Sequence, residues 1–125
     1  MNIIGIGIDI IKIKRFKKIV KFFKKKFLKK ILSYKERKLY NSSSRKINFL
    51  AKRFVIKEAL CKAMGYGMSH GISFNNLEVY SNKMNKPKIN YLGNSKKKKI
   101  FLKIKKSHIS FTDEKKYAQA IVVLE

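Results

Sequence analysis

Asp9 and Glu58 are the residues of this sequence most suited to chemistry, because both are carboxylates in a chain with very few. Lysine and arginine number 32 against 7 acidic residues, which gives a net charge of +25. Scarcity gives both acids more weight than usual, and Glu58, a carboxylate among cations, is suited to hold a metal and phosphates. The simpler alternatives are an exposed Asp9 at a strand end and a surface pair between Glu58 and Lys62.

Glu58 belongs to a predicted helix over residues 49–64. Asn48 is the expected N-cap, and Gly65 suits the left-handed residue just past the helix end. The apolar residues point in several directions, which indicates a buried helix whose charges need partners. The basic residues within about a turn of Glu58 are therefore candidates for binding phosphates. They are Arg53, Lys57 and Lys62.

Asp9 belongs to a predicted strand in residues 3–10. Its isoleucines alternate with Gly5, Gly7 and Asp9, so these three residues share one face. Two neighbouring positions without side chains allow a ligand or another backbone to come close. A second glycine-rich stretch, residues 65–71, is predicted to form a flexible or tightly turned loop, which can surround a phosphate.

The other elements predict a single α+β domain. Residues 16–32 form an amphipathic helix with one lysine-rich face, either a membrane-surface peptide or, as we favour, a core helix facing solvent or an acidic partner. Ser33 and Glu36 form a capping box for a helix to Tyr40. The remaining predicted elements are strands at 72–80 and 89–92, a lysine-rich helix from 94 or 95 to 106, and a closing hairpin near 107–112 and 117–125.

The positive charge leaves two functions without catalysis open. It favours a nucleic-acid-binding module or a membrane-surface module. Lysine greatly outnumbers arginine, however, which indicates that part of the charge reflects A/T-rich codons, and most aromatic residues occupy core-facing positions rather than a base-stacking surface. No apolar run reaches the roughly 18 residues of a membrane span, and no signal peptide is expected. With a single cysteine, Cys61, predicted to be buried, we expect a cytoplasmic protein without nucleic-acid or membrane partners.

Several segments together resemble holo-acyl-carrier-protein synthases, the short 4′-phosphopantetheinyl transferase family. They are GIGIDIIKIKR at residues 5–15, FLAKRFVIKEALCKAMGYG at 49–67, GISFNNLEV at 71–79, NKP at 85–87 and HISFTDEKKYAQAIVVLE at 108–125. The resemblance spans the chain in order. Its most specific parts are Asp9 followed by Arg15, and Lys57 and Glu58 followed by Lys62.

The resemblance implies one transferase domain over residues 1–125, with an antiparallel sheet packed against a long buried helix. Such proteins work as homotrimers, with coenzyme A bound between neighbouring subunits. The implied reaction is a Mg²⁺-dependent transfer of 4′-phosphopantetheine from coenzyme A to a serine of apo acyl carrier protein, in support of fatty acid biosynthesis. The other product is adenosine 3′,5′-bisphosphate.

The resemblance also implies roles for individual residues. Asp9 and Glu58 hold the metal and act in catalysis with Lys62, and Arg15 docks the carrier protein. The residues expected to bind coenzyme A are Arg53, Lys57, Lys62, Gly65, Gly67 and His108. Many relatives have histidine where this chain has Asp113, so the general base is left open between a metal-bound water and Glu58.

Overall fold

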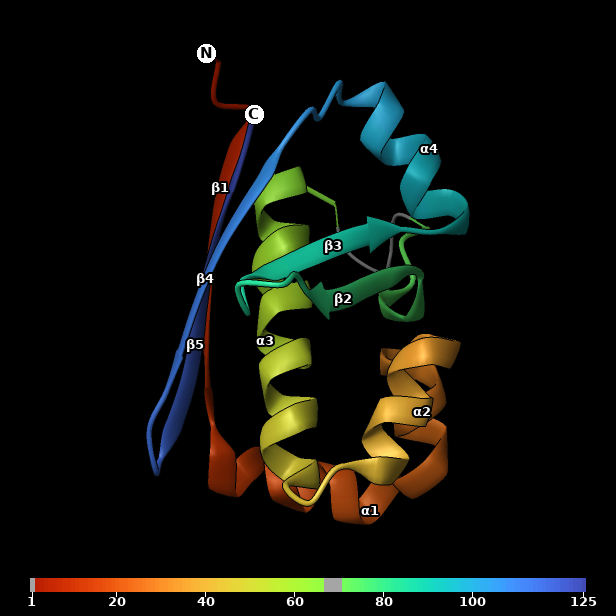
Figure 1. The fold of residues 1–125 in the computed structure, drawn as a ribbon, viewed down its shortest axis with the longest axis vertical. Helices are drawn as coiled ribbons and strands as arrows, with labels where there is room; N and C mark the ends of the chain where they lie inside the picture. The colour runs from red at the N-terminus through yellow and green to blue at the C-terminus, as the bar shows by residue number, and fades with distance from the viewer. Residues whose placement is uncertain (1, 67–70) are drawn as a thin grey trace.

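The fold is α+β, with a three-stranded antiparallel sheet as one layer and the helix α3 (Lys46–Met64) packed against its inner face (Figure 1). This computed structural model describes residues 2–66 and 71–125. The strand order is β1 (Gly5–Lys12), β5 (Tyr117–Leu124), β4 (Ser107–Asp113). The closing hairpin is thus confirmed, and its second strand pairs with the first strand of the chain.

The glycines of β1 bring the strand against the backbone of α3 (Lys46–Met64). A Cβ atom added to Gly5 would lie 1.8 Å from the carbonyl oxygen of Ala63, and one added to Gly7 would lie 1.8 Å from that of Ala59. The predicted close approach is confirmed, and the approaching group is a helix. Asp9 follows on the same strand face and therefore also points toward α3.

The helix α3 ends where the sequence predicts but begins earlier. Gly65 follows its last residue in the left-handed conformation, with φ of 73°. The predicted N-cap, Asn48, is wrong, because Asn48 lies inside the first turn and the helix starts at Lys46 after Arg45. Lys46 stabilises this start differently, by donating hydrogen bonds to carbonyl groups at the end of the preceding helix.

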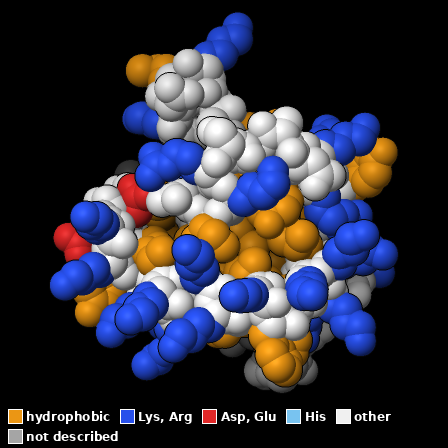
Figure 2. Space-filling view, turned by 90° about the horizontal axis from the view of Figure 1, so that it is seen from below, with side chains coloured by type: hydrophobic (Ala, Val, Ile, Leu, Met, Phe, Trp, Pro, Cys, Tyr) orange, Lys and Arg blue, Asp and Glu red, His pale blue; other side chains and the backbone are white. Residues whose placement is uncertain are grey.

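The amphipathic helix α1 (Ile13–Ile31) is interrupted at Lys24, where φ is 49° and ψ is −129°. Phe16 on its first half and Phe27 on its second half both stack near Phe54 of α3, with ring centroids 5.1 and 6.1 Å away. The charged side faces solvent. Figure 2 shows this end of the molecule covered by lysine and arginine side chains, with hydrophobic side chains between them.

The capping box of α2 (Tyr34–Ser42) is confirmed. The Glu36 amide donates to Ser33 Oγ at 3.2 Å, and the Ser33 amide donates to Glu36 Oε1 at 2.9 Å. Glu36 is nevertheless only 1% exposed. A carboxylate buried to this degree needs more partners than one capping bond.

The second half of the chain adds a smaller layer that crosses α3 in Figure 1. It contains the 3-10 helix η2 (Phe74–Asn76), the hairpin of β2 (Leu77–Ser81) and β3 (Pro87–Tyr91), and α4 (Gly93–Phe101). The predicted strand at 72–80 starts later because η2 occupies its beginning. The predicted lysine-rich helix stops at Phe101, shortly before Lys103 turns to positive φ. Among the helices described, none has the length and apolar character needed to cross a bilayer.

Candidate active site

Asp9 of β1 and Lys62 of α3 meet at the partly exposed edge of the contact between strand and helix. Lys62 Nζ lies 3.1 Å from Asp9 Oδ1 and donates a second hydrogen bond, of 3.0 Å, to the carbonyl oxygen of Ile8. Asp9 is largely covered, with 16% of its side chain exposed, whereas Lys62 is 54% exposed. The Lys62 ammonium group can therefore reorient toward a ligand while the Lys62 backbone stays in α3.

Glu58 lies one helical turn before Lys62 and interacts electrostatically with Asp9. Burial raises the pKa of Glu58 above its ordinary value, the negative charge of Asp9 raises it further, and Lys62 partly offsets both effects. Within residues 2–66 and 71–125, the Glu58 carboxylate has neither a hydrogen bond nor an ion pair. The structure thus brings together all three residues predicted to be catalytic.

The donor set of this site fits Mg²⁺. Two carboxylates that repel each other gain stability when a cation binds between them, which is consistent with the raised pKa of Glu58. The described part of the chain contains no group of three or more histidine, cysteine, aspartate or glutamate residues that could enclose a metal. Mg²⁺ suits such a sparse site, because it is commonly held by one or two carboxylates together with water and substrate phosphates.

An apolar pocket of about 460 Å³ opens beside Glu58, between α1 and α3. Among the described residues that line this pocket, Glu58 alone is acidic. The second half of α1 supplies much of one wall, and Phe54 and Phe74 supply the other side. The wall residues from α1 are Phe23, Lys26, Phe27, Lys30 and Ile31. This pocket can hold an uncharged part of a substrate whose phosphate lies near Glu58.

Lys57 does not face this site, which corrects the prediction that it binds phosphate. It is fully buried, and its Nζ donates to Glu36 Oε1 at 2.6 Å and to the carbonyl oxygen of Ile31 at 2.5 Å. Burial lowers the pKa of Lys57 to about 8, against the opposing effect of Glu36. Helical spacing placed Lys57 next to Glu58 but did not reveal that α2 covers this side of α3.

Arg53 faces the same buried carboxylate. Its Nε lies 3.2 Å from Glu36 Oε2, and its guanidinium carbon lies 3.5 Å from the centre of the Phe49 ring. The orientation of Nε does not give a hydrogen bond, so the contact with Glu36 is one of charge. Burial lowers the pKa of Arg53, and Glu36 acts in the opposite direction. With 8% of Arg53 exposed, its main contacts within this chain are structural, and its role in phosphate binding stays a prediction.

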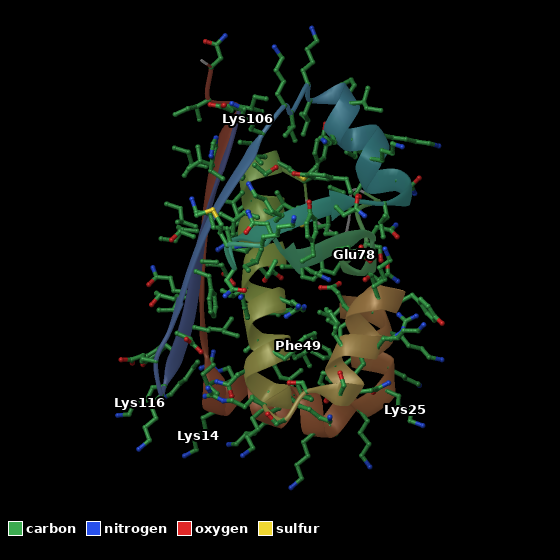
Figure 3. All side chains as sticks on the ribbon, in the orientation of Figure 1. Lys14, Lys25, Phe49, Glu78, Lys106 and Lys116 are labelled. Carbon is green, nitrogen blue, oxygen red and sulfur yellow. The ribbon has the colours of Figure 1, made fainter. Side chains whose placement is uncertain are left out.

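The sequence identified Glu36 as a capping residue but missed this cluster. Glu36 also accepts a hydrogen bond from the Val79 amide at 3.3 Å, and the nearby Glu78 accepts one from Ser33 Oγ at 2.7 Å. Figure 3 shows Glu78 on the smaller layer, beside α2. The available signal was the scarcity of acidic residues, which applies to Glu36 as much as to Glu58.

His108 lies on the opposite face of the sheet from Asp9. In the strand register His108 pairs with Val123, which pairs with Ile6 on the outward face of β1. It lines a second pocket, of about 540 Å³, together with Lys52, Lys86 and Lys88. One chain therefore does not bring His108 to the carboxylate pair, because the sheet lies between them.

The three other predicted site residues have different outcomes. Gly65 lies directly after α3, close in sequence to Lys62. Gly67 falls outside the described residues. Arg15 is exposed on the first turn of α1, on the strongly basic end of the molecule, where Figure 3 shows the neighbouring Lys14.

Comparisons with known proteins agree with this fold and geometry. Residues 5–122 match the 4′-phosphopantetheinyl transferase superfamily. The holo-[acyl-carrier-protein] synthase of Buchnera aphidicola subsp. Schizaphis graminum is 49% identical over 125 residues, covering 100% of this chain and 99% of that protein. The crystal structure of holo-[acyl-carrier-protein] synthase from Neisseria meningitidis has 34% identity and a TM-score of 0.93, covering 99% of both chains.

A second solved structure includes a ligand. The Helicobacter pylori holo-[acyl-carrier-protein] synthase, in complex with coenzyme A, is 35% identical with a TM-score of 0.83. The match covers 96% of this chain and 99% of that one. The sequence match and the shared fold both extend over nearly the whole chain, which therefore belongs to the 4′-phosphopantetheinyl transferase superfamily.

Proposed function

We propose that this protein is a holo-[acyl-carrier-protein] synthase that serves fatty acid biosynthesis. The serine hydroxyl oxygen of an apo acyl carrier protein attacks the phosphorus of coenzyme A that carries the pantetheine arm. The bond from this phosphorus to the bridging oxygen breaks, adenosine 3′,5′-bisphosphate leaves, and the serine proton passes to a base. The observation that carries the proposal is the partly buried pair of Asp9 and Glu58, with Lys62 beside them.

Each residue of the site has a role in this reaction. Bound Mg²⁺ supplies positive charge that stabilises the diphosphate as its bond breaks. Asp9 and Glu58 would hold the ion, and the exposed ammonium of Lys62 would bind a diphosphate oxygen. The Glu58 carboxylate accepts no hydrogen bond in the described part of the chain and is the group of this site best suited to accept the serine proton.

The pocket beside Glu58 suits the pantetheine arm of coenzyme A. That arm is uncharged and begins at the phosphate that is attacked, so it must start close to the metal carboxylates. The phenylalanines of the pocket offer apolar contact along the arm. Lys26 and Lys30 belong to its wall and are placed to attract the phosphate end.

A homotrimer would complete the nucleotide site. The outer face of the sheet exposes a row of isoleucines, with Ile6, Ile8 and Ile10 exposed by 58%, 52% and 56%. An apolar sheet face of this kind favours burial against another copy of the chain. His108 lies on this face, beside a pocket with three lysines, so one subunit's His108 can serve the carboxylate pair of another. Native mass spectrometry with Ile8→Lys as the disrupting variant tests the assembly.

The acidic carrier protein is expected to dock on the basic surface of α1, beginning at Arg15. This surface offers many cations and few acidic residues to oppose them. We also expect the protein to function as one domain in the cytoplasm, as the sequence predicted. Binding to nucleic acid or to lipid vesicles remains the alternative, and neither would depend on Asp9 or Glu58.

The test is incubation with coenzyme A, Mg²⁺ and an apo acyl carrier protein, with the mass of the carrier as the readout. The expected result is the gain of one phosphopantetheine, lost when EDTA replaces Mg²⁺ or when the carrier serine is changed to alanine. An unmodified carrier, combined with tight binding to RNA or anionic vesicles that survives Asp9→Ala, would contradict the proposal.

A further inference from the structure

The buried cluster around Glu36 has no part in the reaction described above. Its oxygens contact four donors or cations: Oε1 accepts from the Ser33 amide and Lys57, while Oε2 accepts from the Val79 amide and lies near Arg53. Lys57 is fully buried and Glu36 is 1% exposed. Burying two opposite charges is costly, and a hydrophobic pair is often at least as stable. The elements that this cluster joins are therefore of interest beyond stability.

The ammonium group of Lys57 joins three elements. Lys57 itself belongs to α3, Glu36 belongs to α2, and the carbonyl oxygen of Ile31 lies in the last turn of α1. The C-terminal carbonyls of a helix carry partial negative charge and lack partners within the helix. Lys57 therefore stabilises the end of α1 and fixes it against α3.

The second half of α1 needs such a contact because the helix is interrupted at Lys24. A regular helix would hold residues 25–31 in line with the first half. Here the positive φ at Lys24 ends that continuity, so the position of the second half depends on its own packing. This half forms much of one wall of the pocket beside Glu58, including Ile31 itself.

We infer that Lys57 is a positioning residue that holds the second half of α1 against α3 and so sets the width of the substrate pocket beside Glu58. The inference rests on the proposed function, in which this pocket receives the pantetheine arm. It assigns Lys57 to coenzyme A binding through Ile31 and the pocket wall, without contact with phosphate.

The chain offers a matched control in Lys46. Its Nζ also binds carbonyl groups at a helix end, those of Tyr40, Asn41 and Ser43, at 3.0–3.1 Å. Lys46 lies 11 positions before Lys57 on α3, which is about 16 Å along the helix axis. It does not line the pocket beside Glu58. Lys46→Met therefore removes the same kind of contact far from the site.

The experiment compares Lys57→Met with Lys46→Met. We expect Lys57→Met to raise the KM for coenzyme A about tenfold while kcat falls by less than about threefold, because the pocket wall shifts but the metal carboxylates remain. Calorimetric titration of coenzyme A in the presence of Mg²⁺ should show the same weakening. Lys46→Met should change neither the KM nor the calorimetric Kd, even if it lowers Tm.

A second variant keeps the inference testable if Lys57→Met does not fold. The double variant Glu36→Gln, Lys57→Met removes both charges together and leaves no unpaired member of the pair. Parent protein that binds coenzyme A but modifies no carrier would contradict the proposed function, and the calorimetric comparison would still decide the role of Lys57. A parental Kd and KM in a folded Lys57→Met or double variant would overturn the inference, as would an equal rise in Lys46→Met.

Discussion

Lys57 and Glu58 are successive residues of α3, and each belongs to a different group of charged side chains. The two groups differ in how fully their charges are neutralised. Lys57 points to a carboxylate that is surrounded by donors and shielded from water. Glu58, the next residue, interacts with another carboxylate, Asp9, and Lys62 lies near both. The charges around Lys57 and Glu36 are balanced and buried. The pair of Asp9 and Glu58 has excess negative charge beside an accessible pocket.

The difference shows which features separate a structural ion cluster from a reactive site. Both groups contain lysine and glutamate on a helix, so residue type does not distinguish them. The number of partners and the access of solvent distinguish the two groups. The Glu36 carboxylate accepts from several donors, whereas the Glu58 carboxylate accepts no hydrogen bond within the described residues and lines a pocket. Unbalanced charge of this kind is stabilised when a cation binds.

Removing a carboxylate from the unbalanced site should have the largest effect. We expect Asp9→Ala or Glu58→Ala to reduce carrier modification by about a thousandfold or more, because each removes one of the two carboxylates proposed to hold the metal. The measurement is the rate of mass gain on the carrier, with circular dichroism to show that the variants fold. Turnover at the parental rate in folded Glu58→Ala would remove Glu58 from the catalytic site.

Removing the carboxylate of the balanced cluster should instead affect stability. Glu36→Gln leaves Lys57 buried without its anion and should reduce the free energy of unfolding by about 3–5 kcal/mol. Urea denaturation measures the change, and Glu114→Gln, an exposed acidic residue, is the control. A difference between the two variants below about 0.5 kcal/mol would show that the buried cluster contributes little to stability.

The lysine of the reactive site should affect substrate binding more than folding. Lys62→Ala removes a cation from the position proposed for the diphosphate, and we expect kcat/KM for coenzyme A to fall about ten- to a hundredfold. Lys96→Ala, on the exposed surface of α4, is the matched control. If Lys62→Ala lowered only Tm, its bond to Asp9 would be structural, like those of the buried cluster.

Exposed charge on α1 provides a third case, in which screening by salt decides the effect. Arg15→Ala should raise the carrier KM several-fold at low salt and less at high salt, because charges attract over a Debye length of about 8–10 Å at physiological salt. Coenzyme A binding should stay unchanged. A carrier titration at two salt concentrations checks this, with Lys97→Ala on the distant α4 as control. Equal carrier KM values in Arg15→Ala and parent would exclude Arg15 from docking.

The smallest expected effect concerns pH. Because the pKa of Glu58 is raised in the folded state, the fold binds this proton more tightly than the unfolded chain does. The resulting contribution to stability is complete below the ordinary value of 4.5 and is lost as pH rises through the folded pKa. Glu58→Gln avoids this loss and should therefore raise Tm at pH 7 by about 1–3 °C, with no gain below pH 4.5. A gain that is independent of pH would point to packing instead.

Local signals predicted the parts of the fold that depend on neighbouring residues. Gly65 marked the end of α3, and Ser33 with Glu36 marked the start of α2, because both features are formed within a few residues. The interruption at Lys24 was not predicted, since neither proline nor glycine occurs there. The early start of α3 was missed because Lys46 binds carbonyls of another helix.

The site was predictable to the extent that residues share an element. Glu58 and Lys62 are one turn apart, so their proximity follows from helical geometry, and Asp9 was placed with them by its glycine-flanked strand and by resemblance to the family. The pairing of Lys57 with Glu36 joins residues 21 positions apart. The spacing of residues along α3 does not reveal which other helix packs against each of its faces. Lys57 was therefore predicted to bind phosphate, although it faces Glu36 of α2.

The contact of Gly5 and Gly7 with the carbonyls of α3 has a consequence for how this protein can change over evolutionary time. The separation between the strand that carries Asp9 and the helix that carries Glu58 is set there by main chain against main chain, without an intervening side chain. Substitution elsewhere, including the accumulation of lysine over the surface, leaves that separation unaltered. The composition of this enzyme's exterior can therefore change while Asp9 and Glu58 keep the same distance.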